Sequence, residues 1–207
     1  MIDEYEALRA ERASLYDTVR ELSPEEWDRP SRCEGWRIRD VVAHVNLGVT
    51  VKPVPFVLGM LRARGDFDRF MGPYAVKQGS RPLPTLLAET AQVAGTGDIP
   101  LTTKRVDLAI DAFVHHHDIA LALDRPVPTD PARLRWLADG MVGANKAIGS
   151  AERTRGLRLI ATDIDWHYGT GPEVRGPVAA LLYAAAGRSD LDGELEGDGL
   201  ATLQARR

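Results

Sequence analysis

The segment from Arg105 to Leu123 contains neither glycine nor proline, and it is rich in alanine, leucine, valine and isoleucine. A run of this length corresponds to about five helical turns, so the segment predicts a long helix that ends before Asp124-Arg125-Pro126. A helix with so many apolar residues needs other elements to cover it. The remaining sequence is therefore expected to supply further helices.

Three other segments predict long helices. In residues 5–22, leucine and valine recur at steps of three, four and seven, and residues 36–48 place four aliphatic side chains on one helical stripe. Gly48 is interpreted as the C-terminal end of the second of these helices. A cap and a first-turn proline in Thr129-Asp130-Pro131 predict a helix that runs to about Ile148.

The stretches between these helices predict shorter elements. Ser23-Pro24-Glu25-Glu26 combines an N-cap serine, a first-turn proline and a glutamate three residues after the cap, which is a capping-box pattern. Glycines and prolines interrupt residues 50–97, where we expect two or three short helices. Whether residues 50–97 form a lid over a site is left open.

The character of the sequence changes after Gly156. Residues 157–169 alternate between apolar and polar side chains, as paired strands do, and residues 173–188 read as a strand that enters a helix. The sequence thus predicts a mainly α protein of the α+β class. Its expected organisation is a helical domain over residues 1–152 and a small α/β domain over residues 153–207.

Composition and charge exclude several classes of partner. The formal net charge of −4 provides no basic surface for nucleic acid. Cys33 is the single cysteine, so no intramolecular disulfide forms and a reducing cytoplasm is the expected location. The charged N-terminus does not resemble a signal peptide. The longest apolar stretch, Val178 to Ala186, is shorter than the roughly 20 residues that span a bilayer, so no membrane association is expected.

The histidine triplet at residues 115–117 is not a metal site by itself. Successive side chains on a helix are rotated by about 100°, which puts His115 and His117 about 200° apart around the helix axis. One ion therefore cannot be held by all three imidazoles.

A different trio has the geometry of a metal site. Asp111 and His115 are four residues apart and lie about 40° apart on one helical face. His44 lies at the edge of the apolar stripe of its helix and is a reasonable third ligand. Two imidazole nitrogens and one carboxylate oxygen resemble the ligands of catalytic zinc. Asp118 either orients His115 or acts as an alternative ligand. The same spacing also occurs in ordinary helix-surface pairs.

Longer stretches around these residues resemble a known family. They are Trp27 with PSRCEGWRIRDVVAHV, then AFVHHHDIALAL, and finally DWHYGTGPEVRGPVAALLYAAAGRSDLDGELEGDGLATL. Together they are similar to the mycothiol-dependent maleylpyruvate isomerase family of actinobacteria. The resemblance implies a DinB-like four-helix bundle whose metal is held by His44, Asp111 and His115. The family more often has glutamate where this chain has Asp111.

The resemblance also implies a chemistry. A divalent metal, Zn²⁺ by expectation, would favour the thiolate of the cofactor mycothiol, and the thiolate would add to an activated double bond and isomerise it from cis to trans. The expected partners are a small thiol and a small electrophilic or dicarboxylate substrate. Arg188, in a Gly-Arg pattern, is the catalytic candidate for carboxylate binding, although it also suits a helix C-terminus. Cys33 is expected to pack near the start of the helix that carries His44 rather than to act as the nucleophile.

Two alternatives remain at the level of sequence. A mycothiol S-transferase would use the same metal site, and a noncatalytic DinB-like module that binds a small ligand or has a regulatory role would leave it empty. The oligomeric state does not follow from the sequence, and a homodimer is kept as an open alternative.

Overall fold

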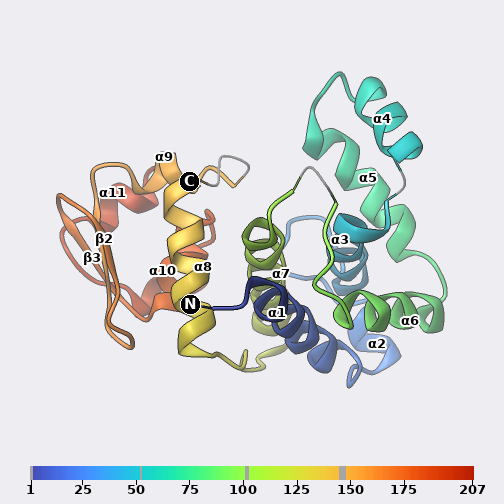
Figure 1. The fold of residues 1–207 in the computed structure, drawn as a ribbon, viewed down its shortest axis with the longest axis horizontal. Helices are drawn as coiled ribbons and strands as arrows, with labels where there is room; N and C mark the ends of the chain where they lie inside the picture. The colour runs from blue at the N-terminus through green and yellow to red at the C-terminus, as the bar shows by residue number, and fades with distance from the viewer. Residues whose placement is uncertain (1, 52, 101–102, 145–147) are drawn as a thin grey trace. The chain divides into compact units, whose positions relative to one another are not determined.

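The long helices predicted from the sequence are present in the structure, a computed structural model that describes residues 2–51, 53–100, 103–144 and 148–207. The described chain is mainly helical with one small sheet, so the predicted fold class is confirmed. Its contacts divide it into two compact units, residues 3–127 and residues 128–207 (Figure 1). Among the described residues, none of the helices combines the length and apolar character needed to cross a membrane.

The unit of residues 3–127 is entirely helical over its described part. Its elements are α1 (Glu4–Val19), α2 (Pro24–Trp27), α3 (Ile38–Thr50), α4 (Pro53–Arg62), α5 (Phe67–Gly79), α6 (Leu83–Ala94), α7 (Arg105–Ala120) and the 3-10 turn η1 (Leu121–Leu123).

Side chains fix where the first two helices begin. The carboxylate of Asp3 accepts hydrogen bonds from the backbone N–H groups of Tyr5 and Glu6, and so caps α1. At α2, Ser23 and Glu26 form the predicted capping box, since each side chain accepts a hydrogen bond from the other's backbone N–H.

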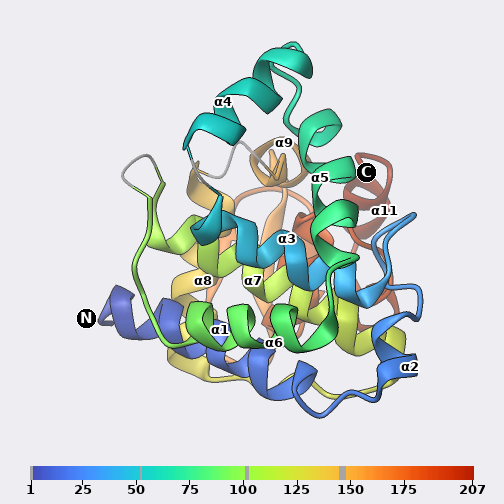
Figure 2. The same cartoon turned by 90° about the vertical axis from the view of Figure 1, so that its right-hand side faces the viewer.

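Four helices of this unit form a bundle. Helix α1 packs against α6 and α7, and α3 packs against the same two helices, so that the four contact one another in a closed ring (Figure 2). The bundle therefore uses α6, one of the short helices predicted between residues 50 and 97, as its fourth member. Helix α3 also packs along α5.

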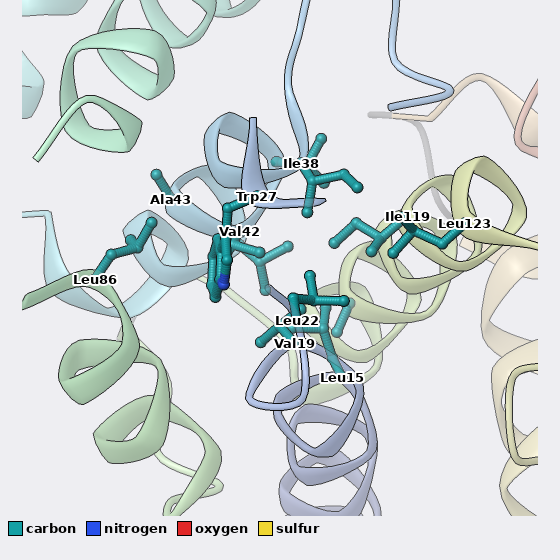
Figure 3. Close-up of a cluster of buried hydrophobic side chains, with 13 residues drawn as sticks. Leu15, Val19, Leu22, Trp27, Ile38, Val42, Ala43, Leu86, Ile119 and Leu123 are labelled. Atoms are coloured by element: carbon teal, nitrogen blue, oxygen red, sulfur yellow. The ribbon is translucent and has the colours of Figure 1, made fainter. Parts of the chain in front are cut away.

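The core of the bundle lies between these helices. Aliphatic side chains from α1, α3, α6 and α7 meet there with Trp27 of α2 (Figure 3). Fully burying one leucine or isoleucine side chain contributes about 1.5–3 kcal/mol, so this cluster is a main source of the bundle's stability. Its buried members are Leu15, Val19, Leu22, Trp27, Ile38, Val41, Val42, Ala43, Val45, Leu86, Ala112, Ile119 and Leu123.

Gly48 does not end its helix, contrary to the prediction, because α3 continues to Thr50. The glycine instead faces α7. A Cβ atom at Gly48 would lie 3.2 Å from Cδ2 of Leu108, which is tighter than normal van der Waals contact. The missing side chain thus allows α3 and α7 to approach closely, next to the residues predicted to bind metal.

The unit of residues 128–207 contains the sheet. Its elements are α8 (Pro131–Ala144), α9 (Ser150–Thr154), β1 (Arg158–Ala161), β2 (His167–Gly169), β3 (Glu173–Gly176), α10 (Val178–Ala185), the 3-10 turn η2 (Asp192–Glu194) and α11 (Leu200–Gln204).

The strands predicted after Gly156 pair in the order β2-β1-β3. Leu159 of β1 is opposite Tyr168 in an antiparallel pair and opposite Val174 in a parallel pair. Helix α10 follows β3, as predicted, and nearly all of its residues are buried. Trp166, which the structure buries, donates a hydrogen bond from its indole nitrogen to Asp139 of α8.

The helix predicted to run from Pro131 to about Ile148 corresponds to α8, which extends to Ala144, and residues 145–147 lie outside the described residues. Contacts group α8 with the sheet, whereas the sequence assigned it to a domain of residues 1–152. The packing of α8 against α9 and α10 explains this grouping. The boundary between independently folding domains stays a prediction.

Two members of the histidine triplet are part of the core. His116 is completely buried, and its Nε2 atom lies 2.7 Å from the hydroxyl of Thr18 on α1. Burial, together with the neighbouring His117, lowers the pKa of His116 to about 3. His117 donates from Nδ1 to the carbonyl of Phe113, and its burial lowers its pKa as well.

We predict that His116 makes the protein sensitive to acid. In the unfolded chain this imidazole takes up a proton near pH 6.5, whereas in the folded chain it stays neutral down to about pH 3. Stability is therefore lost as the pH falls below 6.5, by about 1.4 kcal/mol per pH unit for one such histidine. His116→Gln should reduce the slope of the free energy of unfolding against pH by this amount between pH 6 and pH 4.5. Urea unfolding measures this slope. Equal slopes in the two proteins would contradict the prediction.

Candidate metal centre

The three residues predicted to bind metal come together between α3 and α7. His44 lies on α3, and Asp111 and His115 lie one turn apart on α7. One carboxylate oxygen, Oδ1 of Asp111, is 3.4 Å from Nε2 of His44 and 3.6 Å from Nε2 of His115. The donor atoms of all three residues lie within 4.8 Å of one another. The described chain thus contains a compact group of two nitrogens and one oxygen.

The spacing of these atoms suits a metal ion, and the contact between His44 and Asp111 is also a long hydrogen bond. A good N–H···O hydrogen bond measures about 2.7–3.2 Å, which is shorter than both distances to Asp111. Donor atoms around a tetrahedral ion with bonds of about 2.0–2.2 Å are about 3.4 Å apart. The side chains of His44 and His115 are largely covered, with 12% and 11% of their areas exposed, while Asp111 is 31% exposed. Ligand access would be from the side of Asp111.

The other nitrogen of His115 is held by a buried carboxylate. Nδ1 lies 2.9 Å from Oδ2 of Asp118, whose side chain has no exposure to solvent. Because an ionised carboxylate only accepts hydrogen bonds, Nδ1 carries the proton and donates it. When His115 is neutral, its Nε2 atom therefore presents a lone pair toward Asp111 and His44. Of the two roles left open for Asp118, this arrangement favours the orienting one.

Cys33 lies closer to the site than its sequence context indicated. Its thiol donates to the same oxygen of Asp118 over 3.0 Å, and Sγ is 3.5 Å from Nδ1 of His115. The donor atoms of Cys33, His115 and Asp118 form a second group that could hold a metal. Both protons point at one carboxylate oxygen, however, so we interpret this group as a hydrogen-bonded support for His115. The predicted packing near the start of α3 describes only part of its environment.

Trp36 covers the imidazoles. Its ring centroid is 5.1 Å from that of His44 and 6.4 Å from that of His115. Residues 31–36 are fastened to the end of α7, where the N–H of Arg32 donates to the carbonyl of Asp118. No pattern in the sequence indicated that Trp36 would cover the imidazoles. The one sequence feature that pointed to this location is that Trp36 lies just before the helix that carries His44.

The charges in the site shift two pKa values. Burial raises the pKa of Asp111, but the charges of His44 and His115 outweigh it and the net pKa is lowered. Burial lowers the pKa of His115, whereas its contacts with Asp118, Cys33 and Asp111 raise it well above the usual value. The metal-free site thus pairs an ionised Asp111 with a His115 that holds its second proton tightly.

Arg188 belongs to the other unit of the chain. It follows α10, and its backbone N–H donates to the carbonyl of Tyr183, which closes the end of that helix. Its charge also lowers the pKa of Arg153, after the larger effect of that residue's own burial. Its predicted role in binding a carboxylate is not tested by this arrangement and stays a prediction.

Known proteins resemble this chain in sequence family and in fold. Residues 8–166 match the family model described as mycothiol maleylpyruvate isomerase N-terminal domain. Two solved structures have a similar fold, that of the mycothiol-dependent maleylpyruvate isomerase, with a TM-score of 0.63 and 15% identity, and that of a histidine-to-alanine mutant, with a TM-score of 0.61 and 14% identity. Each alignment covers 93% of this chain and 90% of the other. No curated protein sequence matches the chain.

We predict that metal affinity increases with pH. A metal must displace the proton on Nε2 of His115, and the raised pKa of this imidazole makes that proton harder to remove. Zn²⁺ affinity should therefore rise about tenfold per pH unit below that pKa, as one proton is released for each ion bound. Competition with a fluorescent chelator between pH 6 and pH 8 measures this dependence. An affinity that does not change with pH would contradict it.

Asp118 both orients His115 and raises its pKa, and the variant Asp118→Asn tests both effects. Losing the charge that orients His115 should weaken metal binding about 10–100-fold at pH 8. The same loss lowers the pKa of His115, so the affinity of the variant should depend less on pH, and the two proteins should differ less at pH 6. If Asp118 were only a packing residue, the pH profiles of the variant and the wild type would be parallel.

Proposed function

Because the chain belongs to the mycothiol maleylpyruvate isomerase N-terminal domain family, we propose that it is a metal-dependent enzyme that uses mycothiol to isomerise an activated cis double bond. The observation that carries this proposal is the convergence of His44, Asp111 and His115 on one point, with a spacing that suits a tetrahedral ion.

The donor set fits a divalent ion such as Zn²⁺. His44 and His115 would bind through Nε2 and Asp111 through Oδ1, which leaves a position for a further ligand. An ion bound there would supply the charge that favours the thiolate of a coordinated thiol, and a thiolate can add reversibly to an activated double bond. The nucleophilic sulfur would thus come from the cofactor.

The protein's own contribution is to hold the two imidazoles in place. Asp118 keeps a proton on Nδ1 of His115, so that the lone pair of Nε2 is directed at the ion. Trp36 lies against both imidazole rings and reduces their contact with water. A drier site strengthens the electrostatic interactions within it. These contacts let the imidazoles bind a metal with little rearrangement.

Asp111 is a workable ligand despite being shorter than the glutamate that the family more often has. Its oxygen reaches to within 3.4 and 3.6 Å of the two imidazole nitrogens. We propose that the close approach of α3 and α7 at Gly48 compensates for the shorter side chain, because it brings the two helices together near the site.

A dicarboxylate is the proposed class of substrate, and Arg188 is its proposed partner. The charge of Arg188 lowers the pKa of Arg153, after the larger effect of burial, so the two guanidinium groups are within electrostatic range of each other. The proposed location is the cytoplasm, where a thiol cofactor stays reduced.

We predict that tag-free protein contains close to one divalent ion per chain, and that His44→Ala and His115→Ala remove it. Each variant deletes one of three protein ligands, and inductively coupled plasma mass spectrometry measures the loss. His167→Ala is the matched control, because this histidine is exposed on β2. Wild-type protein that is metal-free, and stays so after incubation with Zn²⁺, would overturn the enzymatic proposal and favour a binding module.

Once the metal content has been measured, the products of turnover distinguish an isomerase from an S-transferase. With mycothiol and maleylpyruvate, the loaded enzyme should convert the cis to the trans isomer without net consumption of thiol, as seen by ultraviolet absorbance and thiol titration. Consumption of thiol with formation of a stable adduct would instead identify an S-transferase. Asp111→Asn should abolish either activity, because it removes the only anionic ligand of the proposed set.

A further inference from the structure

A cavity with cationic sides lies between α4 and α5, which run beside each other in both views of the molecule (Figures 1 and 2). Its volume is about 320 Å³, near the lower end of the range for small-molecule pockets. The residues that line it are Gly59, Arg62, Ala63, Arg69, Phe70, Pro73, Tyr74 and Lys77.

One side of the cavity is aromatic. The rings of Phe70 and Tyr74 are stacked with their centroids 5.4 Å apart. Gly59 makes room for the first of them, because a Cβ atom at this position would lie 2.1 Å from the Phe70 ring. The glycine therefore lets the Phe70 ring, which is only 8% exposed, pack against the backbone of α4, and the partly buried Tyr74 ring is the more accessible of the two aromatic groups.

Three of the other lining side chains are cationic. Arg69 and Lys77 lie eight residues apart on one stripe of α5, and Arg62 approaches from the end of α4. No carboxylate lines the cavity, and none of these three cations forms an ion pair with a side chain in the described part of the chain. In a protein whose net charge is −4, such a group of unpaired cations selects for an anion.

We propose that this cavity binds a small aromatic carboxylate, with its ring on Phe70 and Tyr74 and its carboxylate among Arg62, Arg69 and Lys77. Guanidinium groups suit a carboxylate because their paired N–H groups match its two oxygens. An inorganic anion would satisfy the cations but leave the aromatic surface uncovered. A neutral aromatic molecule would leave the cations without a partner.

This site is separate from the proposed metal centre. Its lining residues lie on α4, on α5 and at Ala63 in the turn that joins them, whereas the predicted metal ligands lie on α3 and α7. Binding in the cavity does not depend on a metal or on mycothiol, so the inference goes beyond the proposed function. An experiment can therefore contradict the proposed cavity ligand without contradicting the proposed function, and the reverse.

The probe for this site is 4-fluorobenzoate, titrated with the full-length protein and followed by ¹⁹F NMR line broadening. Arg69→Gln/Lys77→Gln should weaken binding at least about fivefold, the upper end of what one exposed charge pair contributes. Gly59→Ala should also weaken it, by displacing the Phe70 ring while all charges remain. Arg64→Gln is the matched control, because it removes one cation from the same region without touching the cavity.

Further probes identify what is recognised. The neutral 4-fluorobenzamide should bind at least about fivefold more weakly than 4-fluorobenzoate, and inorganic phosphate should displace 4-fluorobenzoate only weakly. His115→Ala should bind the probe as the wild type does. Circular dichroism of every variant identifies any that do not fold. Absence of binding to the wild type, equal binding by all folded variants, or loss of binding in His115→Ala would each overturn the proposal.

Discussion

The candidate metal centre depends on one buried carboxylate. Asp118 has no contact with water, and an ionised carboxylate in such a place costs several kcal/mol unless partners compensate it. Its partners include the imidazole of His115 and the thiol of Cys33, which come from α7 and from the loop before α3. The need to satisfy this charge thus ties the loop to the helix. It also fixes the orientation of the imidazole whose far side faces Asp111.

Local patterns in the sequence were sufficient to predict most of the helices and strands. Periodicity located α1 and α3, a run without glycine or proline located α7, and the capping pattern at Ser23 located α2, because these features depend on residues only a few positions apart. Gly48 was misinterpreted for the opposite reason. A glycine that ends a helix and a glycine that admits a neighbouring helix look alike in a sequence, and only the packing of Leu108 distinguishes them. The role of α6 in the bundle was likewise decided by tertiary contacts.

The candidate metal centre also combines residues that local patterns predict with residues that only tertiary contacts bring together. The pair of Asp111 and His115 could be predicted because four residues correspond to about one helical turn. The choice of His44 rested on its helical face and on the family resemblance, since α3 and α7 are far apart in the sequence. Cys33 and Trp36 were missed because they reach the imidazoles from an irregular loop, where side-chain direction does not follow a simple period. At 15% identity, the similar solved structure supports the fold and leaves the reaction to be established by experiment.

The position of Cys33 has a practical consequence for studying the protein. It is the single cysteine in the chain, and its sulfur lies 3.0 Å from Asp118 and 3.5 Å from His115. A fluorophore or spin label attached through thiol chemistry would therefore be placed at one defined point beside the candidate metal centre, and it would also remove the thiol proton that Asp118 accepts. Modification of the native cysteine would thus disturb the support of His115 without any engineered substitution.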